Sequence, residues 1–466
     1  MPILTALAIA GRLGPDGWRL VPQLPFELAA CPARWFKWMR LPVVSYALPA
    51  LIAIGQARHR ARPTRNPLTR AARGLAGART LRVLRGIQPS SGGYLEATPL
   101  TSFVVMSLAA AGFPAHPVAR EGIAFLTRAV RGDGSWPIDT NLATWVTTMA
   151  VDALGGLESK GPEAAASERV GESEGRSPSI KVIEWLLAQQ YQREHPYTQA
   201  APGGWAWTDL PGGVPDADDT AGALVALRTL APRDPRALEA AAAGVRWLLD
   251  LQNGDGGMPT FCRGWGALPF DRSGADLTAH AVCAWLAWRD DVPELHQRIE
   301  VALDRAARYL AREQRPDGAW APLWFGNAAA PGHVNFTYGT SKVVMAMARL
   351  AARHTEGAAA TLQRGAAWLI AAQREDGGWG GALDAPAATI EETALAVAAL
   401  AAAGPSGERH AAITRGVEWL RSATDGGRVY PAAPIGLYFA SLWYSEDLYP
   451  VIFTVAALEA AAGGGA

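Results

Sequence analysis

From about residue 87 to the end of the chain, apolar residues recur with helical spacing in paired segments separated by glycine-rich turns. The fullest form of the turn, at 373–379, reads Gln-x-x-Asp-Gly-Gly-Trp. The turns lie at 88–94, 132–136, 203–205, 252–258, 314–320, 373–379 and 425–428. Their spacing of roughly fifty residues is typical of stacked helix hairpins. Alternation with period two is not sustained anywhere, so the pattern predicts an all-α protein.

The turn has a physical explanation. Asp-Gly and Gly-Gly allow the positive φ that a tight turn needs after a helix. The Gln can hydrogen-bond backbone groups of the turn, and the Trp can pack across the next unit. Because one helix pair cannot bury its apolar stripe alone, the pairs must stack. We therefore predict an α/α toroid, with one complete barrel at 131–466 and a partial second helical domain at 1–130.

Within 1–130, an apolar run at 41–57 precedes an arginine-rich stretch at 58–85 that contains no acidic residue. Pro42 and Pro49 interrupt the apolar run, which is also short for a membrane span, so no transmembrane helix is predicted. Two interpretations stay open. The stretch is either a solvated helix and loop of a cytoplasmic protein, or a basic edge beside a membrane-facing apolar segment. The second interpretation predicts peripheral attachment to the cytoplasmic side of a membrane.

Composition narrows the function classes. The 466 residues suffice for two domains, and the formal net charge of zero indicates no bulk attraction to nucleic acid. The three cysteines have no CxxC spacing, so neither a disulfide framework nor a zinc site is predicted, which fits a reducing compartment. The eighteen tryptophans are unusual, because many follow glycines in loops where core packing does not require them.

The candidate chemistry lies at Asp216-Ala217-Asp218-Asp219, between a Gly/Trp-rich loop and an apolar helical run. Like charges this close cannot all ionise comfortably, so at least one carboxyl is expected to stay protonated near neutral pH. A protonated Asp beside tryptophans indicates a Brønsted acid. The alternative is structural, because an Asp that precedes a helix is a common N-cap.

The repeated turns and the acidic motif together resemble squalene-hopene cyclases and their class II terpene-cyclase relatives. Further matching segments occur in the same order along the chain, from about Gln88 to Pro450. They are Pro202-Gly203-Gly204-Trp205-Ala206-Trp207 before the acidic motif, Asp276-Leu277-Thr278-Ala279-His280, and Asn335-Phe336-Thr337-Tyr338-Gly339-Thr340. Ordered matches over this length make chance a poor explanation.

The resemblance implies roles for five residues. Asp218 would protonate a terminal alkene, Asp216 would belong to the network that holds the proton, and Asp219 would face the first carbocation. His280 matches the family histidine that pairs with the acidic motif and raises its acidity when protonated. Tyr338 matches a tyrosine near the same site that takes part in reprotonation through water.

Aromatic positions transfer in the same way. Trp145, Trp207, Phe261 and Trp324 match residues that line the family's cavity. Tyr438 stands in the region where the family has a late aromatic cluster that stabilises later cations, but the aromatic residues here follow a different pattern, so the later steps do not transfer. Ring faces suit this chemistry, because they stabilise a carbocation without a lone pair that would quench it. The alternative for each single aromatic is packing between repeats.

The leading prediction is a protonation-initiated cyclase of a linear polyprene, squalene or a related triterpene, with no cofactor and no metal. An alternative is a cyclase of a prenyl diphosphate or prenylated aromatic, for which the arginines at 58–85 could form a basic pocket. A third is a non-catalytic helical-barrel binding or scaffold protein. Segment 24–55 resembles the middle of the family's second domain, so we expect a shortened form, or a homodimer or partner that supplies the missing repeats.

Overall fold

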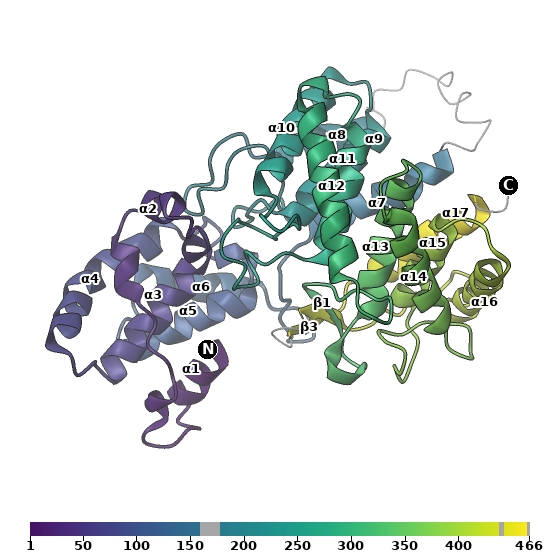
Figure 1. The fold of residues 1–466 in the computed structure, drawn as a ribbon. Helices are drawn as coiled ribbons and strands as arrows, with labels where there is room; N and C mark the ends of the chain where they lie inside the picture. The colour runs from purple at the N-terminus through teal and green to yellow at the C-terminus, as the bar shows by residue number, and fades with distance from the viewer. Residues whose placement is uncertain (159–177, 438–441, 464–466) are drawn as a thin grey trace.

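The computed structural model of the chain describes residues 1–158, 178–437 and 442–463. Six inner helices form its main ring (Figure 1). They are α7 (Ala143–Glu158), α9 (Ala217–Leu230), α11 (Ala275–Trp288), α13 (Phe336–Ala351), α15 (Ile390–Ala402) and α17 (Tyr449–Gly463). Each packs against the next, and α17 packs back against α7, so the ring is closed.

A second layer of helices covers this ring. In the described residues it consists of α8 (Pro178–Gln189), α10 (Pro235–Leu251), α12 (His296–Glu313), α14 (Ala358–Ala371) and α16 (Gly407–Ala423). Inner and outer helices alternate along the chain, as the hairpin pattern requires. The predicted all-α toroid with one complete barrel is confirmed.

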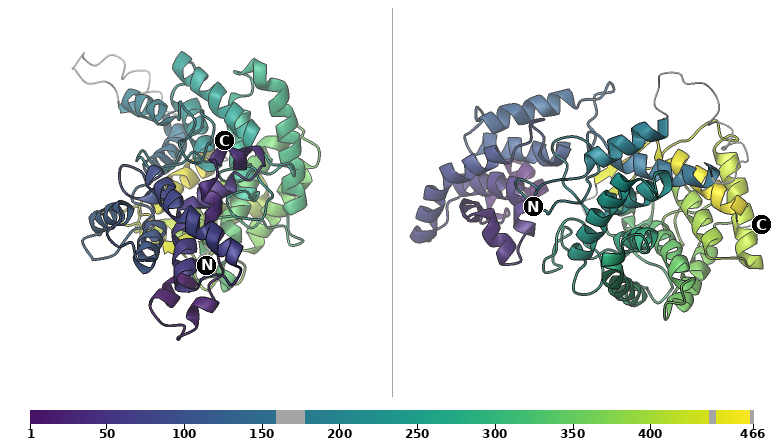
Figure 2. Two further views of the ribbon diagram at one scale, coloured as in Figure 1. Left: turned by 90° about the vertical axis from the view of Figure 1, so that its left-hand side faces the viewer. Right: turned by 90° about the horizontal axis from the view of Figure 1, so that it is seen from above.

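The N-terminal helices form a separate body beside the barrel, clear in Figures 1 and 2. They are α1 (Pro2–Ile9), α2 (Ala33–Trp38), α3 (Val43–Ala61), α4 (Pro67–Gly86), α5 (Thr98–Ala110) and α6 (Pro117–Arg128), with 3-10 turns η1 (Gly17–Arg19), η2 (Phe26–Ala30) and η3 (Tyr94–Glu96). The helix α3 packs against α5, and the two share a core of their own around Ile52, Val104 and Leu108. This is the partial second domain, and we propose that its boundary lies between α6 and α7.

The glutamines of the turns make one repeated contact. Each Nε2 donates to the carbonyl of a turn glycine and to a carbonyl of the following outer helix. The pairs are Gln88 with Gly92 and Val118, Gln190 with Gly203 and Ala240, Gln252 with Gly256 and Ala302, Gln314 with Gly318 and Thr361, and Gln373 with Gly377 and Ala412. Each glutamine therefore joins one repeat to the next.

The tryptophans of three turns, Trp205, Trp320 and Trp379, are fully buried. Each donates its indole N–H to a carbonyl of the preceding outer helix, at 2.7–2.8 Å. The rings lie against glycines of the next outer helix, Gly244, Gly365 and Gly416, where a β-carbon would come within 2.7–2.8 Å of a ring atom. Packing between repeats accounts for these tryptophans.

A small antiparallel sheet lies beside the barrel, with strands β1 (Phe325–Asn327), β2 (Ile435–Leu437) and β3 (Leu442–Tyr444) in the order β1-β2-β3. Phe325 pairs with Leu437, and Ile435 pairs with Tyr444. Three-residue strands are too short to give a period-two signal, so the sequence did not predict them.

The apolar run at 41–57 forms most of α3. Its side chains Leu48 and Ile52 are buried in the core of the partial domain, and Tyr46 is buried against Val214 and Cys262 of the barrel. A buried helix and an interfacial one share an apolar composition, so the sequence could not separate them. Nowhere in the described ranges does a helix combine the length and the apolar character that crossing a bilayer requires.

Candidate active site

The acidic motif forms the first turn of the inner helix α9. Asp216 is the N-cap, and its Oδ1 accepts the backbone N–H groups of Asp218 and Asp219, both at 2.9 Å. Its own N–H donates to the carbonyl of Trp205, and this hydrogen bond joins the motif to the Gly/Trp-rich loop. The N-cap interpretation therefore holds for Asp216, while Asp218 and Asp219 remain available for other roles.

Asp216 and Asp219 are buried, and no basic side chain pairs with either in the described residues. Burial raises the pKa of both, and the two carboxyls interact through their side chains. Asp216 Oδ2 and Asp219 Oδ1 have no donor as ionised groups. With its pKa raised well above the ordinary value, Asp219 is protonated near neutral pH, as the clustering of like charges predicts.

Asp218 is different. Its Oδ1 lies 2.6 Å from Nδ1 of His280, which comes from the neighbouring inner helix α11. The side chains of Asp218 and His280 keep 17% and 18% of their surface accessible, whereas Asp216 and Asp219 are below 5%. Of the three carboxyls, Asp218 is therefore the one that keeps accessible surface and has a potential cationic partner.

Asp276, a further buried carboxyl, lies one helical turn before His280. Asp276 accepts the backbone N–H of Leu323 at 3.1 Å, and burial, with a contribution from Asp218, raises its pKa to about 7. Asp139, in the connection before α7, has its pKa raised to about 7 by burial and by Glu96.

No group of three His, Cys, Asp or Glu side chains in the described residues is placed to hold a metal ion.

Aromatic rings lie on one side of the pair formed by Asp218 and His280. The Trp145 ring stands edge-on to His280 with centroids 6.3 Å apart, and it stacks on Phe325 at 6.4 Å. Phe325 in turn lies 4.6 Å from the ring of Tyr338. The Trp145 indole donates to the hydroxyl of Tyr449 at 2.8 Å, so its orientation is fixed.

A second aromatic group lies beside the acidic motif. Phe261 meets Trp207 edge-on at 6.2 Å and Phe270 at 5.7 Å, and Phe270 lies 6.5 Å from Trp324. The carbonyl of the residue before Phe261, Thr260, accepts the N–H of Ala217 at 2.8 Å. The structure thus brings Trp207, Phe261 and Trp324 into one cluster beside the acid.

Tyr338 is buried at the start of α13, and burial raises its pKa well above the ordinary value. It is therefore neutral near pH 7.

The predicted residue Tyr438 lies outside the described residues. Sequence reasoning missed Tyr46, Phe325, Tyr444 and Tyr449, and the only signal for the last two was the aromatic density around 443–449.

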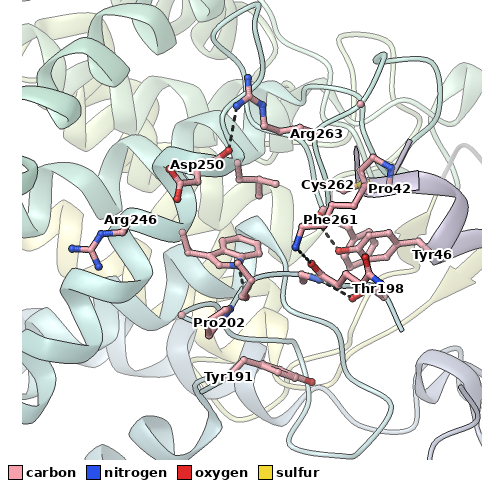
Figure 3. A pocket seen from close by; sticks show the side chains of 18 of the residues that line it. Pro42, Tyr46, Tyr191, Thr198, Pro202, Arg246, Asp250, Phe261, Cys262 and Arg263 are labelled. Atoms are coloured by element: carbon pink, nitrogen blue, oxygen red, sulfur yellow. Dashed lines mark hydrogen bonds between the residues drawn. The ribbon is translucent and has the colours of Figure 1, made fainter. Parts of the chain in front are cut away.

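Behind the second aromatic group, a cavity of about 930 Å³ lies between the partial domain and the barrel (Figure 3). Tyr46 of α3 stacks on Phe261 at 5.2 Å and donates to its carbonyl, and both rings form one wall. Four basic side chains line the cavity: Lys37, Arg40, Arg246 and Arg263. The arginines at 58–85, from which the sequence predicted a basic pocket, do not line this cavity.

An α/α toroid with a buried aspartate motif at the start of an inner helix is the arrangement expected of class II terpene-cyclase relatives. The sequence signature described as the squalene-hopene cyclase C-terminal domain matches residues 162–461. The chain belongs to this family.

The names of individual relatives describe different cyclases. A terpene cyclase-glycosyl transferase fusion protein of Humicola fuscoatra is 30% identical over 430 residues, which cover 83% of this chain and 31% of that protein. Drimenyl diphosphate synthase of Streptomyces showdoensis is 37% identical over 247 residues, which cover 52% of this chain and 41% of that protein. The chain spans 31–46% of the length of the first curated relatives that it matches.

The solved structure of ent-copalyl diphosphate synthase from Streptomyces platensis shares the fold. The TM-score is 0.54 at 22% sequence identity, and the similarity covers 96% of this chain and 83% of that chain. At this identity the similarity concerns the architecture.

Proposed function

We propose that this protein is a class II terpene cyclase that starts cyclisation by protonating an alkene of a linear polyprene, with Asp218 as the acid. The observation that carries this proposal is the asymmetry among the three carboxyls. Asp216 and Asp219 are buried, whereas the side chain of Asp218 is partly accessible and lies 2.6 Å from His280. An acid that must touch substrate has to be the accessible one.

The first step follows from this geometry. The proton on the free oxygen of Asp218 goes to the terminal alkene carbon, whose π pair forms the new C–H bond and leaves a tertiary cation. A proton on His280 Nδ1 donates to Oδ1 and stabilises the carboxylate that forms. The buried Asp219 is protonated near neutral pH, which limits the negative charge beside the acid.

Ring closure then moves the cation away from Asp218. Each new C–C bond consumes an alkene and places positive charge one ring further on. The faces of Trp145, Phe325 and Tyr338, and those of Trp207, Phe261 and Trp324, stabilise this charge without forming bonds to it. Loss of a proton or capture of water ends the sequence. Tyr338, neutral because its pKa is raised, does not quench the cation as a phenolate would.

Squalene or a related triterpene is the first substrate candidate, because the family signature is that of squalene-hopene cyclases. The basic residues of the interdomain cavity favour a second candidate, a prenyl chain with an anionic head. Lys37 is paired with Glu194 at 2.8 Å, but Arg40 makes no ion pair in the described residues, and Arg263 contacts only a backbone carbonyl. These two guanidinium groups could bind a diphosphate.

The deciding experiment is incubation of purified protein with squalene and with geranylgeranyl diphosphate, followed by mass spectrometry of the products. We expect a cyclic product from one of them, and no product from Asp218→Asn. The matched control is Glu392→Gln, another buried carboxyl, which accepts hydrogen bonds from Asn327 and Asn335 and not from His280. No product from any linear polyprene would favour the non-catalytic scaffold.

Peripheral membrane association is also part of the proposal, at a different surface from the one the sequence indicated. Trp35 and Trp38 of α2 are 52% and 85% exposed, and Trp265 in the loop after Arg263 is 73% exposed. Exposed tryptophans beside basic residues suit a membrane interface. Vesicle flotation of the protein and of Trp38→Ser tests this surface, and equal flotation of the two would contradict it.

A further inference from the structure

Glu96 joins the partial domain to the acidic motif of the barrel. It ends the turn η3 just before α5, and its side chain is 1% exposed. Its Oε1 accepts the backbone N–H of Gly212 at 2.8 Å and the hydroxyl of Ser91 at 2.6 Å. Gly212 belongs to the barrel, four residues before Asp216. A buried carboxyl of one domain therefore holds the loop that leads to the acid in the other.

The contact at Gly212 is close. A β-carbon there would lie 2.6 Å from Glu96 Oε1, and 2.9 Å from both the nitrogen of Glu96 and the carbonyl oxygen of Gly93. No side chain fits at these distances, so the loop is pressed against η3. Glycine is required here by the approach of the two backbones.

The connection from Gly212 to Asp216 is short and constrained. Pro211 before it and Pro215 within it each have a fixed φ, and Val214 is fully buried. The carbonyl of Gly213 accepts a hydrogen bond from the Tyr191 hydroxyl at 2.7 Å. This connection ends at Asp216, whose Oδ1 accepts the backbone N–H of Asp218.

The backbone at Glu96 is itself unusual. Leu95 and Glu96 adopt φ values of 55° and 51°, in the left-handed region that non-glycine residues rarely occupy. Such a conformation persists only where the surroundings determine it. The carbonyl of Glu96 accepts the N–H of Thr140, in the connection to α7, at 3.1 Å, so η3 is fastened to the barrel from a second direction.

We infer that Glu96 is a positioning residue, which holds the acidic motif in register with His280 through the N–H of Gly212. The partial domain is then part of the catalytic assembly and not only a wall of the site. The inference rests on the proposed role of Asp218, so its test includes a readout that needs no substrate.

That readout is the proton on His280 Nδ1, in the 2.6 Å contact with Asp218. A proton in so short a bond resonates far downfield in the NMR spectrum, and loss of the signal in His280→Gln assigns it. We expect Glu96→Ala to shift or broaden the signal. Glu96→Gln keeps an acceptor for Gly212 and should restore it. The control Glu392→Ala removes an equally buried carboxyl elsewhere in the barrel and should leave the signal in place.

The kinetic arm uses the same variants with the substrate found above. Displacement of the acid by about 1 Å predicts a fall in kcat of about 100-fold per folded molecule for Glu96→Ala, with KM little changed. Gly212→Ala should give a similar loss. Because both changes break one contact, the double variant should be no worse than the more impaired single variant.

Two results would overturn the inference. The first is an unchanged His280 signal in Glu96→Ala, whether or not a substrate has been found. The second is a kcat per folded molecule in Glu96→Ala that equals that of Glu392→Ala, which would make Glu96 a stability residue only. A parent enzyme without activity on any polyprene would instead count against the proposed function, and the NMR result would still decide the role of Glu96.

Discussion

His280 Nδ1 lies 2.6 Å from Asp218 Oδ1, and the two residues come from neighbouring inner helices, α11 and α9. The contact distinguishes Asp218 from Asp216 and Asp219, which are buried without a basic partner in the described residues. A partly accessible carboxyl with a basic neighbour is suited to general acid catalysis, because the acid must be within reach of the group that it protonates.

The first prediction concerns Asp218. In Asp218→Asn the amide cannot release a proton to an alkene, so we expect cyclisation to fall by at least about 10³-fold, within the range for loss of a general acid. Because the side chain is partly accessible and Asn preserves its shape, the melting temperature should change little. Product formation and a thermal melt check the two parts separately. Activity near that of the parent would assign the acid to another residue.

The second prediction concerns its partner. In His280→Gln the carboxylate left after proton transfer loses its cationic neighbour, and we expect a rate about 10–100-fold lower. The products should stay the same, because the same acid protonates the same alkene. Comparing rates and product ratios for His280→Gln and Asp218→Asn checks this. A changed product pattern with an unchanged rate would place His280 in ring closure instead.

Much of the fold could be predicted because its signal is local. The Gln and Gly residues that form each turn lie within a few residues of one another in the sequence. Their repetition along the chain predicts that the helix hairpins stack. The acidic motif was equally visible. The N-cap role belongs to Asp216 because its Oδ1 accepts the N–H groups of Asp218 and Asp219, and the sequence did not show which of the three aspartates precedes the first helical turn.

The rest of the candidate site depends on contacts between distant segments. Tyr46, Phe325 and Tyr449 reach it from the partial domain, a three-residue strand and the last helix, and none lies in a motif. The apolar run at 41–57 was assigned to a membrane surface in one interpretation because composition does not tell which neighbours cover a helix.

The third prediction concerns pH. Burial raises the pKa of Asp276 to about 7, above its value in the unfolded chain. The stability that the protonated form contributes is complete below about pH 4 and is lost as pH rises through about 7. Asp276→Asn cannot ionise, so its stability relative to the parent should rise by about 2–3 kcal/mol between pH 5 and pH 8. Urea unfolding at both values checks this, and an equal difference at both would contradict the raised pKa.

The fourth prediction separates packing from chemistry. In Gly365→Ala the new methyl group would lie 2.7 Å from the Trp320 ring and 2.8 Å from Val344. Because Trp320 is fully buried, the overpacking should lower the free energy of unfolding by about 1–3 kcal/mol. The rate per folded molecule should not change. The control is Gly74→Ala in α4, where nothing lies within 4 Å and a small gain in stability is expected.

The last prediction concerns Tyr449, whose hydroxyl accepts the indole N–H of Trp145 at 2.8 Å and lies 3.1 Å from the hydroxyl of Tyr444. Tyr449→Phe leaves the buried indole N–H without a partner, which should lower the free energy of unfolding by about 1–3 kcal/mol. The Trp145 ring would also lose its fixed orientation toward His280. Because an early cation depends on that ring face, we expect a larger share of incompletely cyclised products.

Tyr444→Phe is the matched control for this change. It removes the neighbouring hydroxyl but leaves the bond between Trp145 and Tyr449 intact, so it should alter stability and product ratio less than Tyr449→Phe does. Product ratios and thermal melts of both variants decide the question. If the two variants give the same products as the parent, the orientation of Trp145 does not guide ring closure. If only Tyr449→Phe shifts the ratio, a hydrogen bond from the last helix to the first inner helix of the barrel controls how far the cation travels.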